Sequence, residues 1–114
     1  MKKRRKSKGN LLDFVPIKKV DYFIDGEGKA VLLRPKFRSS IFRFWLRLVA
    51  QSLYFKVHLD EVGTFVWKLI DGERTVKQIA ELTRERFGDR VEPCEERVGI
   101  FIRELKQGDF IDYK

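Results

Sequence analysis

The chain has 114 residues and a formal net charge of +8, with one cysteine and one histidine. That length suits one domain with a single core. The lone cysteine, Cys94, cannot form an internal disulfide, and with His58 it cannot complete an ordinary zinc tetrad. No apolar run is long enough to span a bilayer. We therefore expect a reduced, cytoplasmic protein without a metal or another cofactor.

The positive charge is unevenly distributed along the chain. Residues 1–8 carry six basic side chains and no acidic one, and residues 34–59 carry six more, again without an acid. Residues 60–114 hold ten basic and thirteen acidic side chains, so this half is mildly acidic. We expect a disordered basic tail at residues 1–10 and a single domain at residues 11–114.

Two strands joined by a tight turn are predicted near the N-terminal end. Residues 20–24 are rich in aromatic and β-branched side chains, and residues 29–34 form a second run that stops at Pro35. Between them, Gly26 and Gly28 can adopt the positive φ angles that hairpin turns need. The pattern predicts an antiparallel pair of strands.

A third strand is predicted at residues 54–59, because its side chains alternate between two kinds. One face holds Tyr54, Lys56 and His58, and the other holds Phe55, Val57 and Leu59. Such alternation is typical of a strand with one side on a core. Three strands suffice for a small sheet.

Three helices follow, each with a recognisable start and end. Their predicted boundaries are Asp60 to Ile70, Thr75 to Gly88 and Pro93 to Gly108. Asp60 is a candidate N-cap, and Thr75 with Gln78 three residues later fits a capping box. Pro93 suits the first position of a helix. The last residues, 110–113, either pack against the helices or add a short strand.

The sequence between the second and third strands predicts an inserted amphipathic helix, at residues 36–53, rather than a turn. Apolar side chains lie nearly all round residues 39–53, with arginines spaced among them. A helix of that length measures about 22 Å, too short to cross a membrane. It could pack on its own sheet or on a second copy of the protein, or bind a partner or a membrane surface. The candidate interface residues are Phe42, Trp45, Leu46 and Val49.

Several stretches of the chain resemble the PqqD family. The most specific are LDEVGTFVW at residues 59–67 and LIDGERTV at residues 69–76. Further matches are VLLRP at 31–35, Ile79-Ala80, Arg86-Phe87 before Gly88, and FIREL at 101–105. The resemblance covers residues 16–112. It implies an α+β, winged helix-turn-helix-like fold, in which a three-stranded antiparallel sheet is followed by a three-helix bundle, here with an extra helix inserted between strands two and three.

Members of that family, as the resemblance implies, are non-catalytic. They bind the leader of a ribosomally synthesised precursor peptide and present it to a modifying enzyme, in the founding case a radical SAM enzyme of pyrroloquinoline quinone (PQQ) biosynthesis. The expected partners are therefore a precursor peptide and a radical SAM or other maturation enzyme. The inserted residues and the basic tail depart from the family's pattern, and they favour a related branch over the founding pathway.

The resemblance also implies where the leader binds. An extended peptide adds to the open edge of the sheet, between the third strand and the third helix. The residues carried over are Tyr54, Phe55, Lys56, Val57 and His58 on the strand, and Arg97, Phe101, Glu104 and Leu105 on the helix. Lys56 and Arg97 would favour acidic leader positions, whereas Phe101 and Leu105 either accept apolar leader residues or belong to the core.

Two other classes of function stay open. A winged-helix DNA-binding regulator would place the start of the third helix near phosphates, but Glu92, Glu95 and Glu96 lie there and would repel them, so nucleic acid is disfavoured. A structural module would form a homodimer through the inserted helix. An enzyme is not expected, because His58 and Cys94 have no catalytic partners nearby in the sequence.

Overall fold

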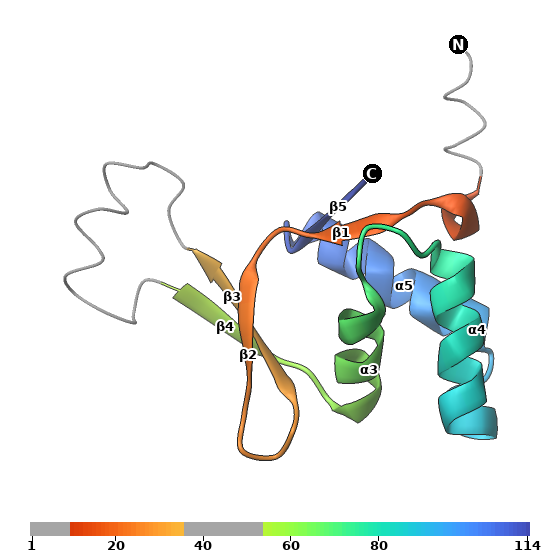
Figure 1. Ribbon diagram of the computed structural model, residues 1–114, viewed down its shortest axis with the longest axis horizontal. Helices are drawn as coiled ribbons and strands as arrows, with labels where there is room; N and C mark the ends of the chain where they lie inside the picture. Colours follow the sequence, from red (N-terminus) through yellow and green to blue (C-terminus); the bar gives the residue numbers. More distant parts are fainter. Residues whose placement is uncertain (1–9, 36–53) are drawn as a thin grey trace, which may run out of the picture.

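The computed structural model describes residues 10–35 and 54–114 (Figure 1). The predicted basic tail lies outside this part of the chain, except for Asn10. The predicted inserted helix at residues 36–53 also lies outside it, and so do the four candidate interface residues Phe42, Trp45, Leu46 and Val49. None of the helices in the described residues is long and apolar enough to cross a membrane.

Three strands form an antiparallel sheet in the order β2-β3-β4. They are β2 (Asp21–Ile24), β3 (Ala30–Pro35) and β4 (Tyr54–His58), so β3 is central and β4 lies at one edge. In the turn between β2 and β3, the Gly28 N–H donates to the Asp25 carbonyl at 3.1 Å, and Gly28 has a φ of 83°. The predicted hairpin and the third strand are confirmed.

A second, two-stranded sheet joins the two ends of the described chain. β1 (Pro16–Lys18) pairs antiparallel with β5 (Ile111–Tyr113), and a 3-10 turn, η1 (Leu11–Asp13), precedes β1. Of the two arrangements expected for the last residues, the short strand is the one that forms. The sequence does not predict its partner β1, because a three-residue strand is too short to show an alternating pattern.

The first two helices of the bundle begin where their capping residues predict. α3 (Glu61–Leu69) is capped by Asp60, whose Oδ1 accepts from the Gly63 N–H at 2.8 Å. At the start of α4 (Val76–Phe87), the Thr75 hydroxyl accepts from the Gln78 N–H, and the Gln78 side chain accepts from the Thr75 N–H. Both caps therefore satisfy backbone donors that would otherwise lack partners.

The third helix, α5 (Cys94–Gln107), starts one residue later than predicted. Pro93 is its N-cap residue rather than its first helical residue, and a proline side chain cannot accept a hydrogen bond. The Glu92 carboxylate caps instead, because its Oε1 accepts from the Cys94 N–H at 3.1 Å. A 3-10 turn, η3 (Gly88–Val91), connects α4 to this helix start.

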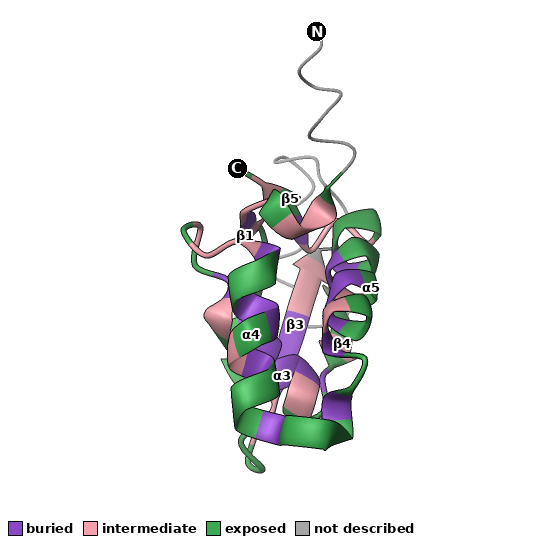
Figure 2. Ribbon diagram, turned by 90° about the vertical axis from the view of Figure 1, so that its right-hand side faces the viewer, coloured by how far each residue is buried: buried purple, intermediate pink, exposed green. Residues whose placement is uncertain are grey.

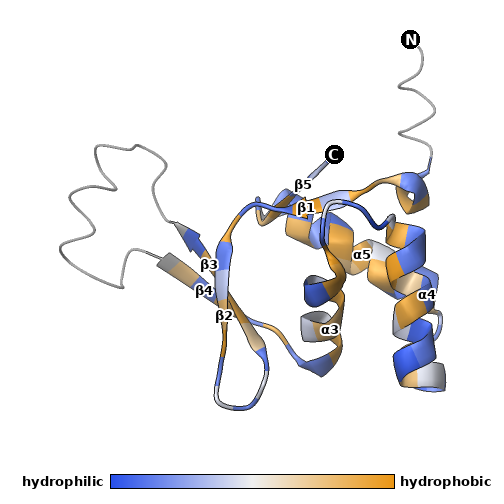
Figure 3. Ribbon diagram, viewed as in Figure 1, coloured by the Kyte–Doolittle hydropathy of each residue, from blue (hydrophilic) through white to orange (hydrophobic). Residues whose placement is uncertain are grey.

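The core lies between the three-stranded sheet and the helices, all of which sit on one side of that sheet (Figure 1). Its largest buried side chains include Leu32, Trp67, Ile70, Ile79, Ile102 and Ile111. Figure 2 shows the buried residues as bands along the helices and β3, and Figure 3 shows hydrophobic and hydrophilic residues alternating around each helix. Residues 10–35 and 54–114 therefore form an α+β fold with a three-stranded antiparallel sheet and three helices.

Candidate functional site

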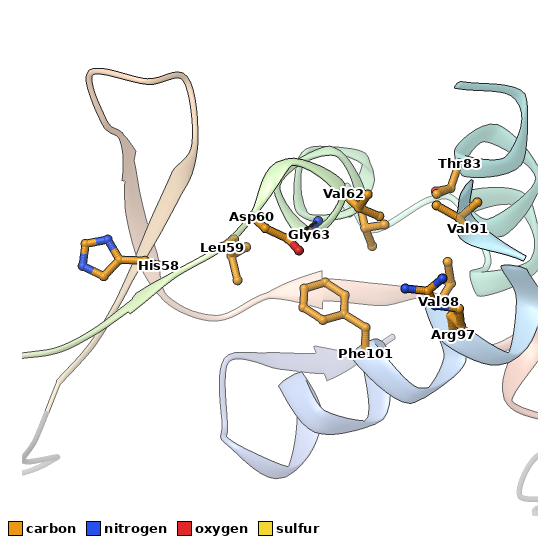
Figure 4. Close-up of a pocket in the computed structure, with 11 residues that line it drawn as sticks. His58, Leu59, Asp60, Val62, Gly63, Thr83, Val91, Arg97, Val98 and Phe101 are labelled. Carbon is orange, nitrogen blue, oxygen red and sulfur yellow. Dashed lines mark hydrogen bonds between the residues drawn. The ribbon is translucent and has the colours of Figure 1, made fainter. Parts of the chain in front are cut away.

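A cavity of about 400 Å³ opens where the end of β4 and the start of α3 meet the middle of α5 (Figure 4). Most of its lining is apolar and comes from Leu59, Val62, Val66, Val91, Val98 and Phe101, with Gly63 and Thr83 among them. The polar lining residues are His58, Asp60 and Arg97. Its size and its mainly apolar lining suit an apolar side chain of a bound molecule better than an ion.

The ring of Phe101 forms one wall of this cavity. It points from α5 toward the start of α3 in Figure 4, and a Cβ placed on Gly63 would lie 3.5 Å from Phe101 Cζ. Phe101 is only half-buried, so part of its ring faces the opening. The absence of a side chain at Gly63 therefore lets helix and ring approach closely without filling the space between them.

The hydrogen bond at the end of β4 shows which backbone groups of that strand point away from β3. The Leu59 N–H donates to the Ala30 carbonyl at 2.9 Å, in the direction of β3. Backbone groups alternate in direction along an antiparallel strand, so those of Lys56 and His58 point toward the outer edge of β4. No strand of the described residues pairs with that edge. The edge can therefore receive an added strand.

The side chains of β4 also alternate, between the face that the helices cover and the face that they do not. Val57 lies opposite Leu32, which is fully buried in the core, so Phe55 and Val57 share the covered face. Lys56 and His58 lie on the other face, and in Figure 4 the His58 ring points away from the cavity. Phe55 is 46% exposed although it is on the covered face.

The four predicted residues of α5 differ in burial. Arg97 and Glu104 are exposed, and Arg97 Nη1 donates to the Arg90 carbonyl at 3.2 Å. Phe101 lines the cavity, whereas Leu105 is 4% exposed and belongs to the core cluster. Of the two roles that the sequence left open for the apolar pair, the structure places Leu105 in the core and Phe101 at the opening.

Three of the nine predicted site residues, His58, Arg97 and Phe101, therefore lie together at the cavity. Phe55, Lys56, Val57, Glu104 and Leu105 do not line it, and the side chain of Tyr54 is outside what the structure describes. The sequence does not identify Val62, Val66, Val91 and Val98 as site residues, since apolar residues at helical spacing indicate core.

The charged groups near the cavity mostly have partners. Glu61 pairs with Arg90 at 3.5 Å, and the Glu92 carboxylate pairs with Arg84 Nε at 2.8 Å. The bond from Arg84, together with the bond from the Cys94 N–H, lowers the pKa of Glu92. These surface pairs connect the start of α3 to η3 and connect α4 to the segment before α5.

The single cysteine, Cys94, is a packing residue. Cys94 is buried, its Sγ donates to the Ala80 carbonyl at 3.2 Å, and burial raises the pKa of the thiol. A thiol in that setting is a poor nucleophile and a good packing residue. Within residues 10–35 and 54–114, no group of histidine, cysteine or acidic residues is placed to hold a metal ion.

The fold and the site define a class of small α+β domain in which an open sheet edge lies beside an apolar cavity. A family model, coenzyme PQQ synthesis protein D (PqqD), matches residues 54–111, and the chain belongs to that family. The match contains β4, the helices α3, α4 and α5, and every residue that lines the cavity. The family consists of accessory proteins of PQQ synthesis. Comparisons with curated proteins and with solved structures returned no match.

Proposed function

We propose that this protein binds the leader of a ribosomally made precursor peptide by strand addition and presents it to a modifying enzyme. One observation carries the proposal: the edge of β4 at which the backbone groups of Lys56 and His58 point outward ends at His58, which lines the apolar cavity beside α5. Main-chain bonds to such an edge provide affinity for any extended peptide, and a neighbouring pocket provides selectivity. Membership of the PqqD family supports the same role.

In the proposed complex, the leader extends the sheet beyond β4. Its backbone exchanges hydrogen bonds with Lys56 and His58, and one apolar side chain enters the cavity against Phe101. Arg97 at the rim favours an acidic residue next to that side chain, because no acidic residue in the described chain pairs with it. Leu105 supports α5 from the core rather than contacting the leader.

DNA binding is less well supported than peptide binding. Glu95 and Glu96 occupy the first turn of α5, which a winged-helix protein would direct toward phosphates. Carboxylates there suit the positive end of the helix dipole but repel a nucleic-acid backbone. The winged-helix-like arrangement is therefore proposed here as a scaffold for peptide capture.

The partner in this proposal is a maturation enzyme of the radical SAM type or a related one, acting in the cytoplasm. The protein supplies no catalytic group, and its contribution is to hold the leader at a fixed place while the enzyme modifies the rest of the precursor. A homodimer through Phe42, Trp45, Leu46 and Val49 would be compatible with this role, since those residues lie outside the matched region.

Substitution of Phe101 tests the proposal. A leader peptide from a short precursor encoded beside the gene is titrated into wild-type protein and into Phe101→Asp, with heat as the readout. We expect low-micromolar affinity for the wild type and a loss of at least about tenfold in Phe101→Asp, because a carboxylate in the apolar cavity lacks a partner.

Ile100→Asp is the matched control. Ile100 is adjacent on α5 and 47% exposed, so the same substitution there should change the affinity less than about twofold. Equal affinities for wild type and Phe101→Asp, in two folded proteins, would remove the cavity from the proposed function.

A further inference from the structure

Arg34 lies between two aromatic rings at the end of β4 that is far from the cavity. Its guanidinium carbon is 4.9 Å from the centre of the Phe55 ring and 5.8 Å from the centre of the Phe110 ring. The three residues come from β3, β4 and the turn between α5 and β5. Stacking of this kind holds the planar guanidinium in one orientation and leaves its N–H edge available.

No acidic residue of the described chain pairs with this arginine. The ion pairs among residues 10–35 and 54–114 involve other basic side chains, including Lys19, Arg74 and Arg84. Arg34 is half-buried, so its charge is partly withdrawn from water without a carboxylate to balance it. A held, partly desolvated guanidinium without a partner is well suited to bind a carboxylate from another molecule.

The side chain of Arg34 lies on the same side of the sheet as the cavity. Arg34 is opposite Phe55 in the register, and both share the face that contains Leu32 and Val57. The guanidinium carbon lies over the ring of Phe55, a residue of β4. The charged group is therefore one strand nearer to the open edge than the backbone of Arg34 on β3. A strand added to β4 would run about 4.8 Å beyond Phe55, within reach of a carboxylate side chain.

The spacing between the cavity and Arg34 follows from β4 itself. The cavity is beside Leu59 and the arginine is beside Phe55, four residues apart, or about 13 Å along a strand. An even number of residues returns a side chain to the same face, so one added strand can serve both places. The sheet is antiparallel throughout, and an antiparallel strand would pass Leu59 first and Phe55 later.

We propose that Arg34 is a specificity-determining residue that binds an aspartate or glutamate four residues C-terminal to the apolar residue that fills the cavity. This inference rests on the proposed function, because it requires an antiparallel peptide on the edge of β4. The bound segment of the leader would then consist of an apolar residue, three further residues and an aspartate or glutamate. Lys56, on the other face, does not contribute to this selection.

A display library tests the spacing without knowledge of the natural precursor. Twelve randomised residues, with a Gly-Ser spacer at each end so that no free C-terminal carboxylate is nearby, are selected on immobilised full-length protein. We expect enrichment of an apolar residue together with aspartate or glutamate four positions after it. Selection on Arg34→Gln should keep the apolar preference and lose the acidic one. The control Lys77→Gln removes an exposed charge from α4, outside the proposed binding site, and should select the same pattern as wild type.

A second measurement uses wild-type protein alone, so it does not depend on the folding of any variant. One selected peptide, with an amidated C-terminus, is compared with its Glu→Gln version by titration. We expect about tenfold weaker binding of the glutamine peptide, in keeping with the loss of a charge-assisted hydrogen bond. Equal affinities, or enrichment of the acid at another spacing, would overturn the role of Arg34 and leave strand addition intact. A library that yields no peptide competing for the edge of β4 would contradict both proposals.

Discussion

At the scale of single residues, Thr64 connects the helices to the sheet. Its hydroxyl oxygen accepts from the Ala30 N–H at 2.9 Å, and both residues are buried. The Ala30 N–H has this partner because the ladder between β3 and β4 ends at that position. A buried backbone donor needs such a partner, so the hydroxyl contributes to both the fold and the placement of the cavity.

We predict that Thr64→Val lowers the free energy of unfolding by about 1–3 kcal/mol, since it leaves the Ala30 N–H buried without an acceptor. Denaturant unfolding measures the change. Thr83→Val is the matched control: Thr83 is also buried, but its hydroxyl donates to the Ile79 carbonyl, which remains within the α4 hydrogen-bond pattern. A cost for Thr64→Val no larger than for Thr83→Val would contradict the assigned role.

The sequence predicts residue roles well where the signal is local. The caps formed by Asp60 and by Thr75 with Gln78 involve partners three residues apart, and both are present. Arg34 shows the opposite case. Alternation along β3 already places it on the side of Leu32, but its two aromatic partners are 21 and 76 residues away in the chain. Only the folded structure brings these three side chains together.

At the scale of elements, the junction between α4 and α5 depends on Glu92. Its carboxylate accepts from Arg84 and from the Cys94 N–H, so it joins the two helices and caps the second. These two bonds lower the pKa of Glu92 from its ordinary value of 4.5. The stabilisation is present above the unfolded-state pKa and is lost as the pH falls through the lower, folded-state pKa.

Glu92→Gln should therefore reduce the melting temperature at neutral pH, and its difference from wild type should shrink as the pH falls below about 4.5. Thermal melts across that range measure this. Asp25 and Asp71, whose pKa values are also lowered by hydrogen bonds, are unchanged in both proteins and cancel in the comparison. Glu96→Gln is the control, and a difference that does not vary with pH for Glu92→Gln would refute the pairing.

The elements themselves differ in how far the sequence predicts them. The three longer strands and the three helices carry their own periodicity and are found from it. The pair β1 and β5 is not, because Pro16 and Tyr113 lie at opposite ends of the chain and short strands are stabilised mainly by each other. The helix α5 starts one residue later than predicted. Pro93 takes the N-cap position rather than the first helical position, and the Glu92 carboxylate caps the Cys94 N–H.

At the scale of the whole molecule, the site depends on more than the family-matched segment. Residues 54–111 contain the cavity and the edge strand, but the central strand β3 precedes them. β3 supplies Ala30 and Leu32 to the core, and it supplies Arg34, whose guanidinium lies over the Phe55 ring. Residues 30–35 therefore contribute both to the core that supports the edge strand and to the proposed second contact with the peptide.

Within the described residues, the three-stranded sheet has one edge at β4, which borders the cavity, and one at β2, which does not. On β2, the Asp25 N–H donates to the Lys29 carbonyl, so the backbone groups of Tyr22 and Ile24 point outward at the opposite edge. That edge carries the exposed apolar side chains of Tyr22 and Ile24, and neither of them lines the cavity. We predict that a leader peptide binds at β4 rather than at β2, which makes the β2 edge an internal control.

Amide hydrogen exchange with and without the leader peptide tests this choice most directly. We expect slower exchange at the amides of Lys56 and His58 in the complex, because their N–H groups form new hydrogen bonds with the added strand. The amides of Tyr22 and Ile24 should exchange at unchanged rates. Protection of Tyr22 and Ile24 instead, or saturating peptide that leaves Lys56 and His58 exchanging at their original rates, would contradict strand addition at β4.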